Sequence, residues 1–438
     1  MPHTRFVAGL RYLLALLAVA LGAAGFATVF RTLLTFVFNL AAGASDVVTM
    51  FERLPVWARV VLPPIGATLA GLVALASKRR AGSQGVGDVM EAVVLGRVRL
   101  SMTTTLLKSL GSWLAIAFGG SLGREGPLIQ FGGALGGKLA RAFSVDAPHG
   151  RALIAAGTAA GFAAAYNTPF AAVLFVLEVV TGVVAMDAIL GAIVAASIAT
   201  AVTRALIGGG PIYGQRAFEL VSSTELLAHA ALGLVAALAA QVFMRMLSLG
   251  EKGFAASRLG QPWRAAAGGL VVGTLAVWLP EVTGNGYEPL NAILDGAIPL
   301  GFLLWLLIAK AVATTASVSS GSPGGVFTPT LFIGAAVGVS FQHLLVALVG
   351  APSSAGAGAY ALVGMAATTA ATTHAPMMAA LLVFELSGDY AIALPLLLAT
   401  AIAAATSRLL RQDSIYGAEL RKRGIAWELT LEGRRVVK

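Results

Sequence analysis

The chain has 438 residues, of which 58% are hydrophobic and only 11% are charged, and its formal net charge is +10. Globular domains carry about 25% charged residues, so the composition excludes an ordinary soluble enzyme or binding domain. There is no cysteine, which excludes disulfides, thiolate metal sites and catalytic thiols. The basic residues lie at the ends of apolar segments and not in a nucleic-acid-binding patch, a pattern typical of loops on the cytoplasmic side of a membrane. We therefore expect a multi-pass membrane protein with both termini in the cytoplasm and no nucleic-acid partner. We take its membrane to be a bacterial inner membrane.

The apolar segments are predicted to be helices, many long enough to cross a hydrocarbon core of about 30 Å. The stretch "LLALLAVALGAAGFATVF" shows no period of two, which excludes a β-barrel. The first apolar run, from Tyr12 to about Ala42, is too long for a signal peptide and predicts one long helix that is tilted or bent. The predicted segments are 9–44, 56–77, 103–119, 128–143, 151–166, 170–184, 186–207, 224–248, 263–280, 299–318, 328–349, 358–373, 376–388 and 390–410.

Two motifs occur in the same order in both halves of the chain. "GPLIQFGGALG" (126–136) matches "TPTLFIGAAVG" (328–338) in the spacing of its proline and glycines, and "NTPFAAVLFVLE" ending at Glu178 matches "HAPMMAALLVFE" ending at Glu385. We predict an internal duplication, with repeat one at about 50–207 and repeat two at about 224–410. Glu178 and Glu385 are expected to bond to backbone amides and hold broken helices. Whether the repeats are parallel or inverted stays open at this point.

Three glycine-rich stretches stand directly before helices. They are "GREGP" around Arg124 and Glu125, "GGVFTP" around Val326 and Phe327, and "GSQGVG" with Ser83, Gln84, Gly85 and Val86. Free N–H groups at a helix start, together with the helix dipole, attract an anion. Because charged groups inside a membrane are usually functional, Glu125 is predicted to occupy the anion's place and to leave when it is protonated or displaced. The alternative is that Glu125 pairs with Arg124 or caps its helix.

These stretches, with "DSIYGAELRKRG" near the end, resemble the CLC family of chloride channels and proton-coupled chloride transporters, from about Arg11 to Gly424. The resemblance implies an all-α polytopic membrane protein, a homodimer whose subunits each have two inverted-topology repeats of tilted and broken helices. It makes Glu125 the gating residue, places Phe327 and Tyr416 beside the path, and gives Lys108 and Arg124 an electrostatic role. The residues expected to bind the anion are Ser83, Gln84, Gly85, Glu125, Gly126, Val326, Phe327 and Tyr416.

Two positions depart from the family pattern. If "QGVG" is aligned with the family's "SGxP", Gln84 stands where the family has a central serine and Gly87 where it has a proline. Ser83 could take the place of that serine only if the loop shifts by one residue, and the anion selectivity stays open. Val179 stands where exchangers of the family usually carry an inner, proton-accepting glutamate. We therefore predict a passive chloride channel gated by Glu125, with a proton/chloride antiporter as the alternative. We expect residues 1–424 to form the transmembrane domain, and residues 425–438 to form a short cytoplasmic tail without CBS domains.

Other classes of function would need other residues. An intramembrane enzyme would need a paired acid, a Ser–His set or a metal cluster, and a cation-coupled transporter would place carboxylates around its site. Neither arrangement is evident, and the five histidines form no HExxH motif. We expect no enzymatic activity, no metal and no cofactor, with chloride as the substrate.

Overall fold

The structure is a computed structural model that describes residues 2–81, 85–96, 98–182, 186–210, 212–214, 225–349, 356–422, 424–430 and 433–437. Its first half holds α1 (Pro2–Ala42), α2 (Val47–Arg53), α3 (Val56–Ala81), α4 (Val86–Val94), α5 (Met102–Ala117), α6 (Glu125–Ala142), α7 (Ala147–Tyr166), α8 (Pro169–Leu174), the π-helix η1 (Phe175–Thr181) and α9 (Met186–Ile207). Its second half holds α10 (Glu225–Ala256), α11 (Trp263–Trp278), the 3₁₀-helix η2 (Pro280–Val282), α12 (Tyr287–Leu294), α13 (Leu300–Ser319), α14 (Phe327–Val349), α15 (Gly356–Thr373), α16 (Pro376–Ser387), α17 (Ala393–Leu410), α18 (Ile415–Lys422), β1 (Ala426–Thr430) and β2 (Gly433–Val437).

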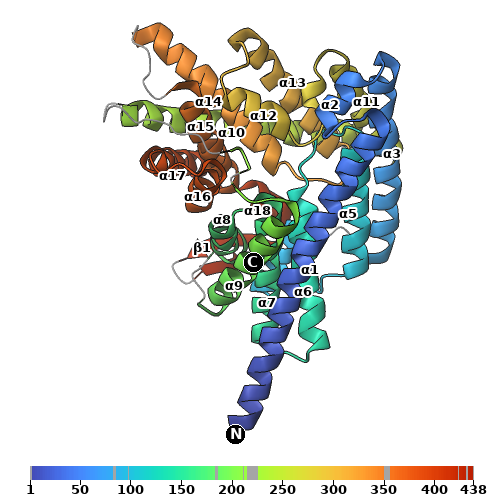
Figure 1. Ribbon diagram of the computed structural model, residues 1–438, viewed down its shortest axis with the longest axis vertical. Helices are drawn as coiled ribbons and strands as arrows, with labels where there is room; N and C mark the ends of the chain where they lie inside the picture. Colours follow the sequence, from blue (N-terminus) through green and yellow to red (C-terminus); the bar gives the residue numbers. More distant parts are fainter. Residues whose placement is uncertain are drawn as a thin grey trace.

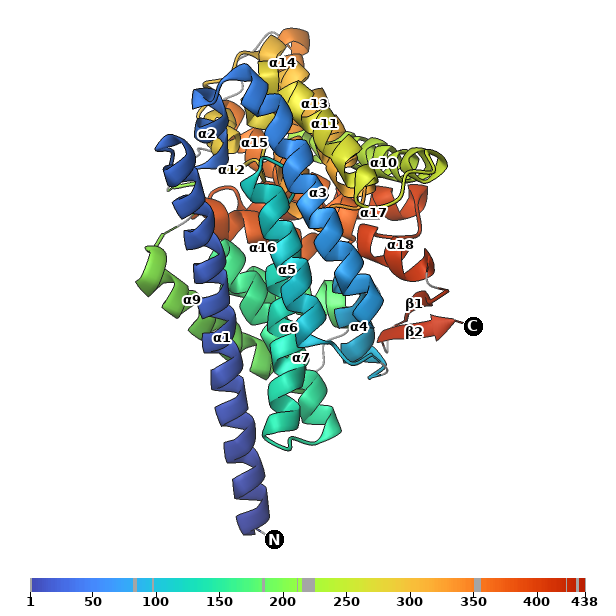
Figure 2. The same ribbon diagram turned by 90° about the vertical axis from the view of Figure 1, so that its right-hand side faces the viewer.

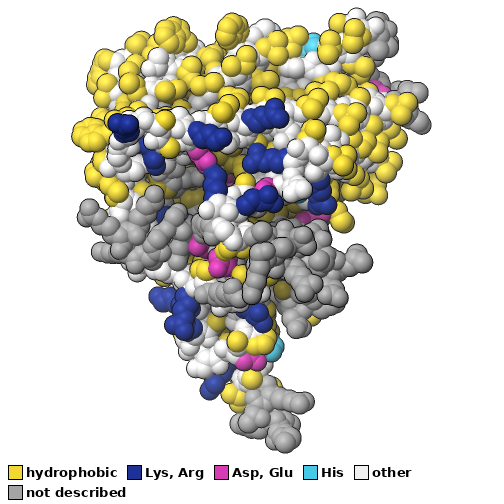
Figure 3. All heavy atoms as spheres, turned by 180° about the vertical axis from the view of Figure 1, so that it is seen from behind, with side chains coloured by type: hydrophobic (Ala, Val, Ile, Leu, Met, Phe, Trp, Pro, Cys, Tyr) yellow, Lys and Arg dark blue, Asp and Glu magenta, His cyan; other side chains and the backbone are white. Residues whose placement is uncertain are grey.

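The predicted architecture of membrane helices is confirmed, and among the described residues β-strands occur only in the tail. Among the described residues, 7 helical stretches are long and apolar enough to cross a membrane, and three shorter apolar helices cover the broken segments at 169–181, 263–278 and 376–387. Many large apolar side chains are exposed on the outer helices, and Figure 3 shows a broad hydrophobic surface next to a band of Lys and Arg side chains. Such a surface suits contact with lipid, with the basic groups at its border.

The first apolar run forms a single helix, as predicted. α1 continues without a break for 41 residues, and Figure 2 shows its first turns extending beyond the other helices. The short helices α2, α12 and α18 lie outside the predicted segments. The antiparallel pairing of β1 with β2 in the tail was not predicted either.

Glycines bring the main helix pair of each repeat into backbone contact. A Cβ at Gly132 of α6 would lie 1.9 Å from the carbonyl oxygen of Gly157 in α7, and a Cβ at Gly334 of α14 would lie 2.5 Å from that of Gly364 in α15. Small residues allow this approach where lipid provides no hydrophobic drive between helices. The α6–α7 and α14–α15 pairs are therefore built alike, and Figure 1 shows one in each half of the chain.

The two repeats also hold each other through reciprocal carboxylates. Glu178 accepts hydrogen bonds from the amides of Met377 (3.3 Å) and Met378 (2.7 Å), in the first turn of α16. Glu385 accepts them from the amides of Phe170 (3.1 Å) and Ala171 (2.8 Å), in the first turn of α8. The predicted role of both glutamates in holding broken helices is confirmed, and the exchange between repeats is the arrangement that a two-fold axis produces.

Candidate anion-binding site

The starts of α6 and α14 meet at a short backbone crossing. The amide of Gly123 donates to the carbonyl of Gly325 at 2.7 Å, and the amide of Gly325 donates to the carbonyl of Gly123 at 2.9 Å. Each glycine stands two residues before its helix, and the two occupy the same place in their repeats. This antiparallel bridge between equivalent residues brings the two helix N-termini together.

The carboxylate of Glu125 lies on the first turn of the opposite helix. Its Oε1 accepts from the amides of Phe327 (3.1 Å) and Thr328 (3.2 Å), and its Oε2 accepts from the hydroxyl of Thr328 (3.0 Å). We call these three donors the carboxylate site. Glu125 is only 2% exposed, so its carboxylate oxygens stand where a small anion would be held by the α14 N-terminus.

The glycines on both sides of the crossing make room for this carboxylate. A Cβ at Gly123 would lie 1.9 Å from Glu125 Oε1, and a Cβ at Gly325 would lie 2.7 Å from the same atom. Atoms cannot approach so closely, so a side chain at either position would displace the carboxylate. The glycines of "GREGP" and "GGVFTP" therefore serve the site itself and not only the turn.

The alternative pairing of Glu125 with Arg124 is not what the structure shows. The guanidinium of Arg124 lies 5.0 Å from the centre of the Tyr287 ring, as in a cation–π contact. The hydrogen bonds of the Glu125 side chain run instead to α14. The guanidinium of Arg124 is therefore directed to Tyr287 and not to the carboxyl group of Glu125, its neighbour in the chain.

A row of aromatic rings connects two predicted site residues. The ring of Phe327 lies 5.7 Å from that of Phe162, Phe162 lies 4.8 Å from Phe175, and Phe175 lies 6.1 Å from Tyr416. Tyr416, on α18, is partly buried against the core. The row brings Tyr416 toward the carboxylate site through two intervening rings, and its contact with an ion stays a prediction.

The third glycine-rich stretch is organised differently. Ser83 and Gln84 lie outside the described residues. The amide of Gly85 donates to the Asp88 carboxylate at 2.6 Å, which caps α4. A Cβ at Gly85 would lie 3.3 Å from the Glu419 carboxylate. Because Asp88 already uses this amide, an anion at Gly85 would have to replace a local cap.

The other predicted residues take less direct places. Gly126 follows Glu125 in the first turn of α6, Val326 directly precedes α14, and Lys108 lies on α5, which packs against α6. The carboxylate uses the amides of Phe327 and Thr328, one residue later than the predicted pair. Sequence reasoning missed Thr328. The available signal was that the N–H groups of a whole first turn are free at a helix start.

Val179 lies inside η1 and is 1% exposed. Repeat one has three residues between Glu178 and Gly182, whereas repeat two has two between Glu385 and Gly388. The π-helix accommodates this extra residue, and such insertions occur frequently at functional sites. An apolar, buried side chain therefore fills the place where the family resemblance implies a proton acceptor in exchangers.

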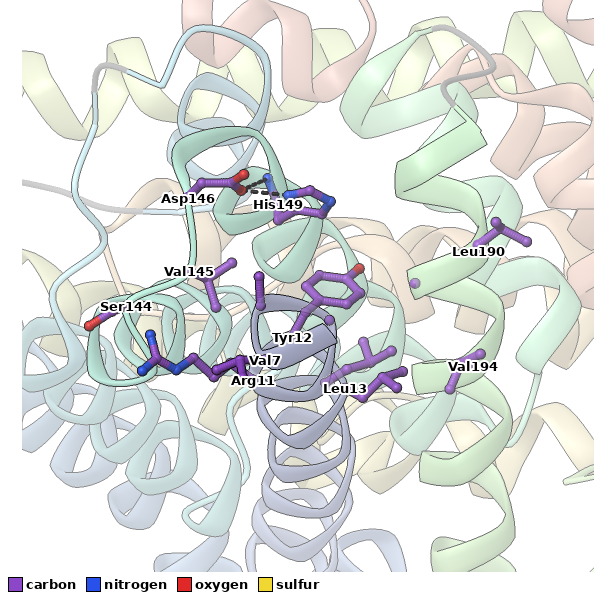
Figure 4. Close-up of a pocket in the computed structure, with 14 residues that line it drawn as sticks. Val7, Arg11, Tyr12, Leu13, Ser144, Val145, Asp146, His149, Leu190 and Val194 are labelled. Atoms are coloured by element: carbon purple, nitrogen blue, oxygen red, sulfur yellow. Dashed lines mark hydrogen bonds and ion pairs between the residues drawn. The ribbon is translucent and has the colours of Figure 1, made fainter. Parts of the chain in front are cut away.

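A separate pocket of about 930 Å³ lies between α1, the α6–α7 turn and α9. Figure 4 shows Tyr12 directed towards His149, whose ring pairs with Asp146 at the start of α7. The His149 side chain and its amide both bond to Asp146 and lower the pKa of that carboxyl. The pocket shares no residue with the carboxylate site, and among the described residues no group of three metal-ligating side chains occurs.

Comparisons with known proteins agree with this geometry. The Voltage gated chloride channel family matches residues 65–408. A putative chloride channel protein ClcB-like of Ralstonia nicotianae is 38% identical over 386 residues, 87% of this chain and 90% of the relative. A voltage-gated ClC-type chloride channel ClcB of Citrobacter koseri is 34% identical over 375 residues, 85% of this chain and 89% of the relative.

Solved structures share the fold. A slow cyanobacterial Cl-/H+ antiporter has a TM-score of 0.83 at 24% identity, with 94% of this chain and 98% of the other covered. A CLC-type fluoride/proton antiporter has a TM-score of 0.74 at 22% identity, with 92% and 96% covered. The chain therefore belongs to the voltage gated chloride channel family, the CLC family that its helix starts resemble.

Proposed function

We propose that this protein carries chloride across the membrane along a path gated by Glu125. The observation that carries the proposal is the side-chain carboxyl group of Glu125 held by the three donors of the carboxylate site. Peptide N–H groups and a hydroxyl bind an anion without a full countercharge, which keeps binding weak enough for release. Chloride and the Glu125 carboxylate then compete for the same donors, so protonation or displacement of Glu125 opens the path.

The remaining site residues are proposed from their places around this point. Phe327 supplies an amide to the carboxylate site, and the positive charges of Arg124 and Lys108 raise anion occupancy along the path. Further contacts are proposed along the rest of the path, from Ser83, Gln84, Gly85, Gly126, Val326 and Tyr416.

We propose passive conduction as the mode of transport. Val179 cannot accept a proton, and it is buried in η1. The curated relatives are named chloride channels. The solved structures of similar fold are named antiporters. Because their sequence identity to this chain is only 24% and 22%, they show the fold and not the mode of transport. Proton/chloride exchange is the alternative, in which another acid or a water chain would reach Glu125.

Ion flux from proteoliposomes tests both the proposed transport of chloride and the proposed passive mode of that transport. Purified protein is reconstituted, a chloride gradient is imposed, and chloride and proton movement are recorded together. Conduction predicts chloride efflux with no uphill proton movement. Stoichiometric proton movement against its gradient would reject the channel mechanism, and the absence of chloride efflux beyond that of empty liposomes would reject chloride transport altogether.

We further propose a homodimer in a bacterial inner membrane with both termini in the cytoplasm. Exposed apolar side chains at the starts of α8 and α16, Phe170 (67%) and Met377 (56%), lie on adjacent helices and offer one face for a second copy. Light scattering in detergent gives the copy number. Because the chain has no cysteine, a single cysteine introduced near either terminus reports its side of the membrane by labelling with an impermeant reagent.

A further inference from the structure

A buried lysine fixes the loop that leads into α12. Lys310, on α13, is fully buried. Its ammonium group donates three hydrogen bonds to consecutive carbonyls, those of Val282 (2.9 Å), Thr283 (3.1 Å) and Gly284 (3.0 Å). An ammonium group has three donors and no acceptor, so these carbonyls use its whole capacity. Because a buried charge is costly unless it is bonded, the loop and the ammonium group hold each other in one arrangement.

The end of this loop stands against the same lysine and against α14. Gly286, which caps the start of α12, has a φ of 95°. A Cβ there would lie 3.3 Å from Lys310 Cε and 3.4 Å from Cδ2 of Phe332 on α14, and the ammonium group lies 5.8 Å from the centre of the Phe332 ring. The left-handed backbone and the small space both favour glycine. The first residue of α12, Tyr287, is therefore placed relative to the helix that binds the Glu125 carboxyl.

The ring of Tyr287 provides a partner for Arg124 that carries no charge. The guanidinium lies 5.0 Å from the centre of the ring. Tyr287 is only 9% exposed, and its ring also packs on that of Tyr213 at 5.6 Å. A ring face attracts a guanidinium more strongly when both are removed from water. Arg124 is thus held on α12, away from the carboxyl of the next residue in the chain.

Two carboxyl groups are within electrostatic reach of Arg124. Arg124 is the cation that acts on Glu125, whereas Glu288, the residue after Tyr287, also faces Arg31 of α1 and Lys310. Without the ring, Arg124 would therefore gain more by pairing with Glu125 than with Glu288. The other titratable groups that face these side chains are Asp46, next to Glu288, and the phenols of Tyr166, Tyr213, Tyr287 and Tyr416.

We propose that Tyr287, held in place by Lys310, keeps the guanidinium of Arg124 away from the carboxyl group of Glu125 and thereby sets the pH at which the anion path opens. This inference rests on the proposed function and adds its regulation. A carboxyl group paired with a guanidinium stays ionised down to a lower pH, so a gate that formed this pair would open only in more acidic solution. Tyr287 and Lys310 are positioning residues that act through Arg124.

The test compares the pH dependence of chloride flux from liposomes. Tyr287→Leu removes the ring and should lower the pH of half-maximal flux by about one unit. Tyr287→Phe keeps the ring face that the guanidinium uses and should keep the wild-type midpoint. Lys310→Met frees the loop and should move the midpoint in the same direction by a smaller amount. In an Arg124→Gln background, Tyr287→Leu should produce no further shift.

Tyr360→Leu is the matched control. Tyr360 is a fully buried tyrosine on α15 whose ring packs on the rings of His229 (4.5 Å) and Phe341 (6.2 Å). Its loss should lower the stability of the protein and leave the midpoint where it is. If Tyr287→Leu does not fold, Tyr287→Met is judged by the same criterion.

Each outcome decides one proposal. Wild-type protein with no chloride flux, or with flux that does not change with pH, counts against the proposed function. Wild-type flux that rises in acid, with a midpoint in Tyr287→Leu equal to or above that of the wild type, overturns the role of Tyr287. An equal shift in Tyr360→Leu overturns it as well, because the loss of any buried ring would then suffice. An unchanged midpoint in Lys310→Met overturns the role of Lys310.

Discussion

The starts of α6 and α14 have the same backbone and opposite chemistry. Gly119 and Gly321 adopt φ of 91° and 92°, the bridge pairs Gly123 with Gly325, and both helices carry a proline in the first turn. At the position that repeat one fills with Glu125, repeat two has Phe327. One repeat therefore supplies a carboxylate and the other supplies its donors. A single side chain breaks the symmetry of the scaffold at this point, and the proposed anion position depends on that difference.

The α8–α16 junction keeps the symmetry that the α6–α14 crossing breaks. There, both repeats have a glutamate, and each is held by two amides of the other repeat. We therefore propose that an amide-bound carboxylate stabilises the fold where both repeats have one, and gates the anion path where only repeat one has it. The experiments that follow separate these two roles.

The largest effect on chloride flux is expected from substitution of Glu125, the carboxylate that has no counterpart in repeat two. Glu125→Gln and Glu125→Ala free the donors on α14, so chloride flux at neutral pH should rise, by about a hundredfold if the lost bonds are worth about 3 kcal/mol. Wild-type flux should increase as the pH falls and Glu125 is protonated, whereas the variants should show a flat pH profile. Chloride flux from liposomes, measured from about pH 4, near the ordinary pKa of a carboxyl group, up to about pH 8, gives the comparison. An unchanged pH response would argue against gating.

Substitution of Glu178 or Glu385 should lower the stability of the protein and leave the pH dependence of chloride flux unchanged. Glu178→Gln and Glu385→Gln each weaken two charge-assisted bonds and should each lower the free energy of unfolding by about 2 kcal/mol. Thermal unfolding in detergent measures this, and the two variants should agree because their sites are equivalent. Glu251→Gln, which breaks an exposed pair with Lys422, is the control and should cost about 0.5 kcal/mol. An unchanged melting temperature together with an altered pH dependence of chloride flux, in either glutamine variant, would contradict the structural role of these two glutamates.

Gly123→Ala tests the room that the crossing leaves for Glu125. The added Cβ would overlap Glu125 Oε1, so the carboxylate should leave and chloride flux at neutral pH should rise about tenfold. Gly25→Ala is the control, because a Cβ there meets nothing within 4 Å. In a Glu125→Ala background, Gly123→Ala should add nothing further. A further rise in flux in that background would show that Gly123→Ala does not act through contact with the Glu125 side chain.

The smallest effect is expected from Tyr416, which reaches the site only through other rings. Tyr416→Ala should weaken chloride affinity about threefold, and Tyr416→Phe should share that loss if the hydroxyl carries it. Calorimetry with chloride measures both. Identical affinity in the alanine variant would remove Tyr416 from the anion path.

The sequence predicted most of the fold because its helix ends are marked by glycine and proline. The "GREGP" and "GGVFTP" stretches also predicted two matched helix starts, although the bridge between Gly123 and Gly325 was seen only in the structure. The hydrogen bond between the hydroxyls of Thr328 and Tyr166 could not be predicted from the sequence, because it joins residues 162 positions apart and depends on side-chain geometry. The π-helix was missed because one extra residue before Gly182 resembles an ordinary shift in a loop.

Bromide located by anomalous scattering tests the central claim most directly. In crystals of the Glu125→Ala variant soaked in bromide, the account predicts a peak within hydrogen-bond distance of the Phe327 and Thr328 amides, where the Glu125 carboxylate now lies. Wild-type crystals should show that position empty of bromide while Glu125 fills it. Bromide found only away from these amides in the variant would contradict the claim that an anion and Glu125 compete for one place.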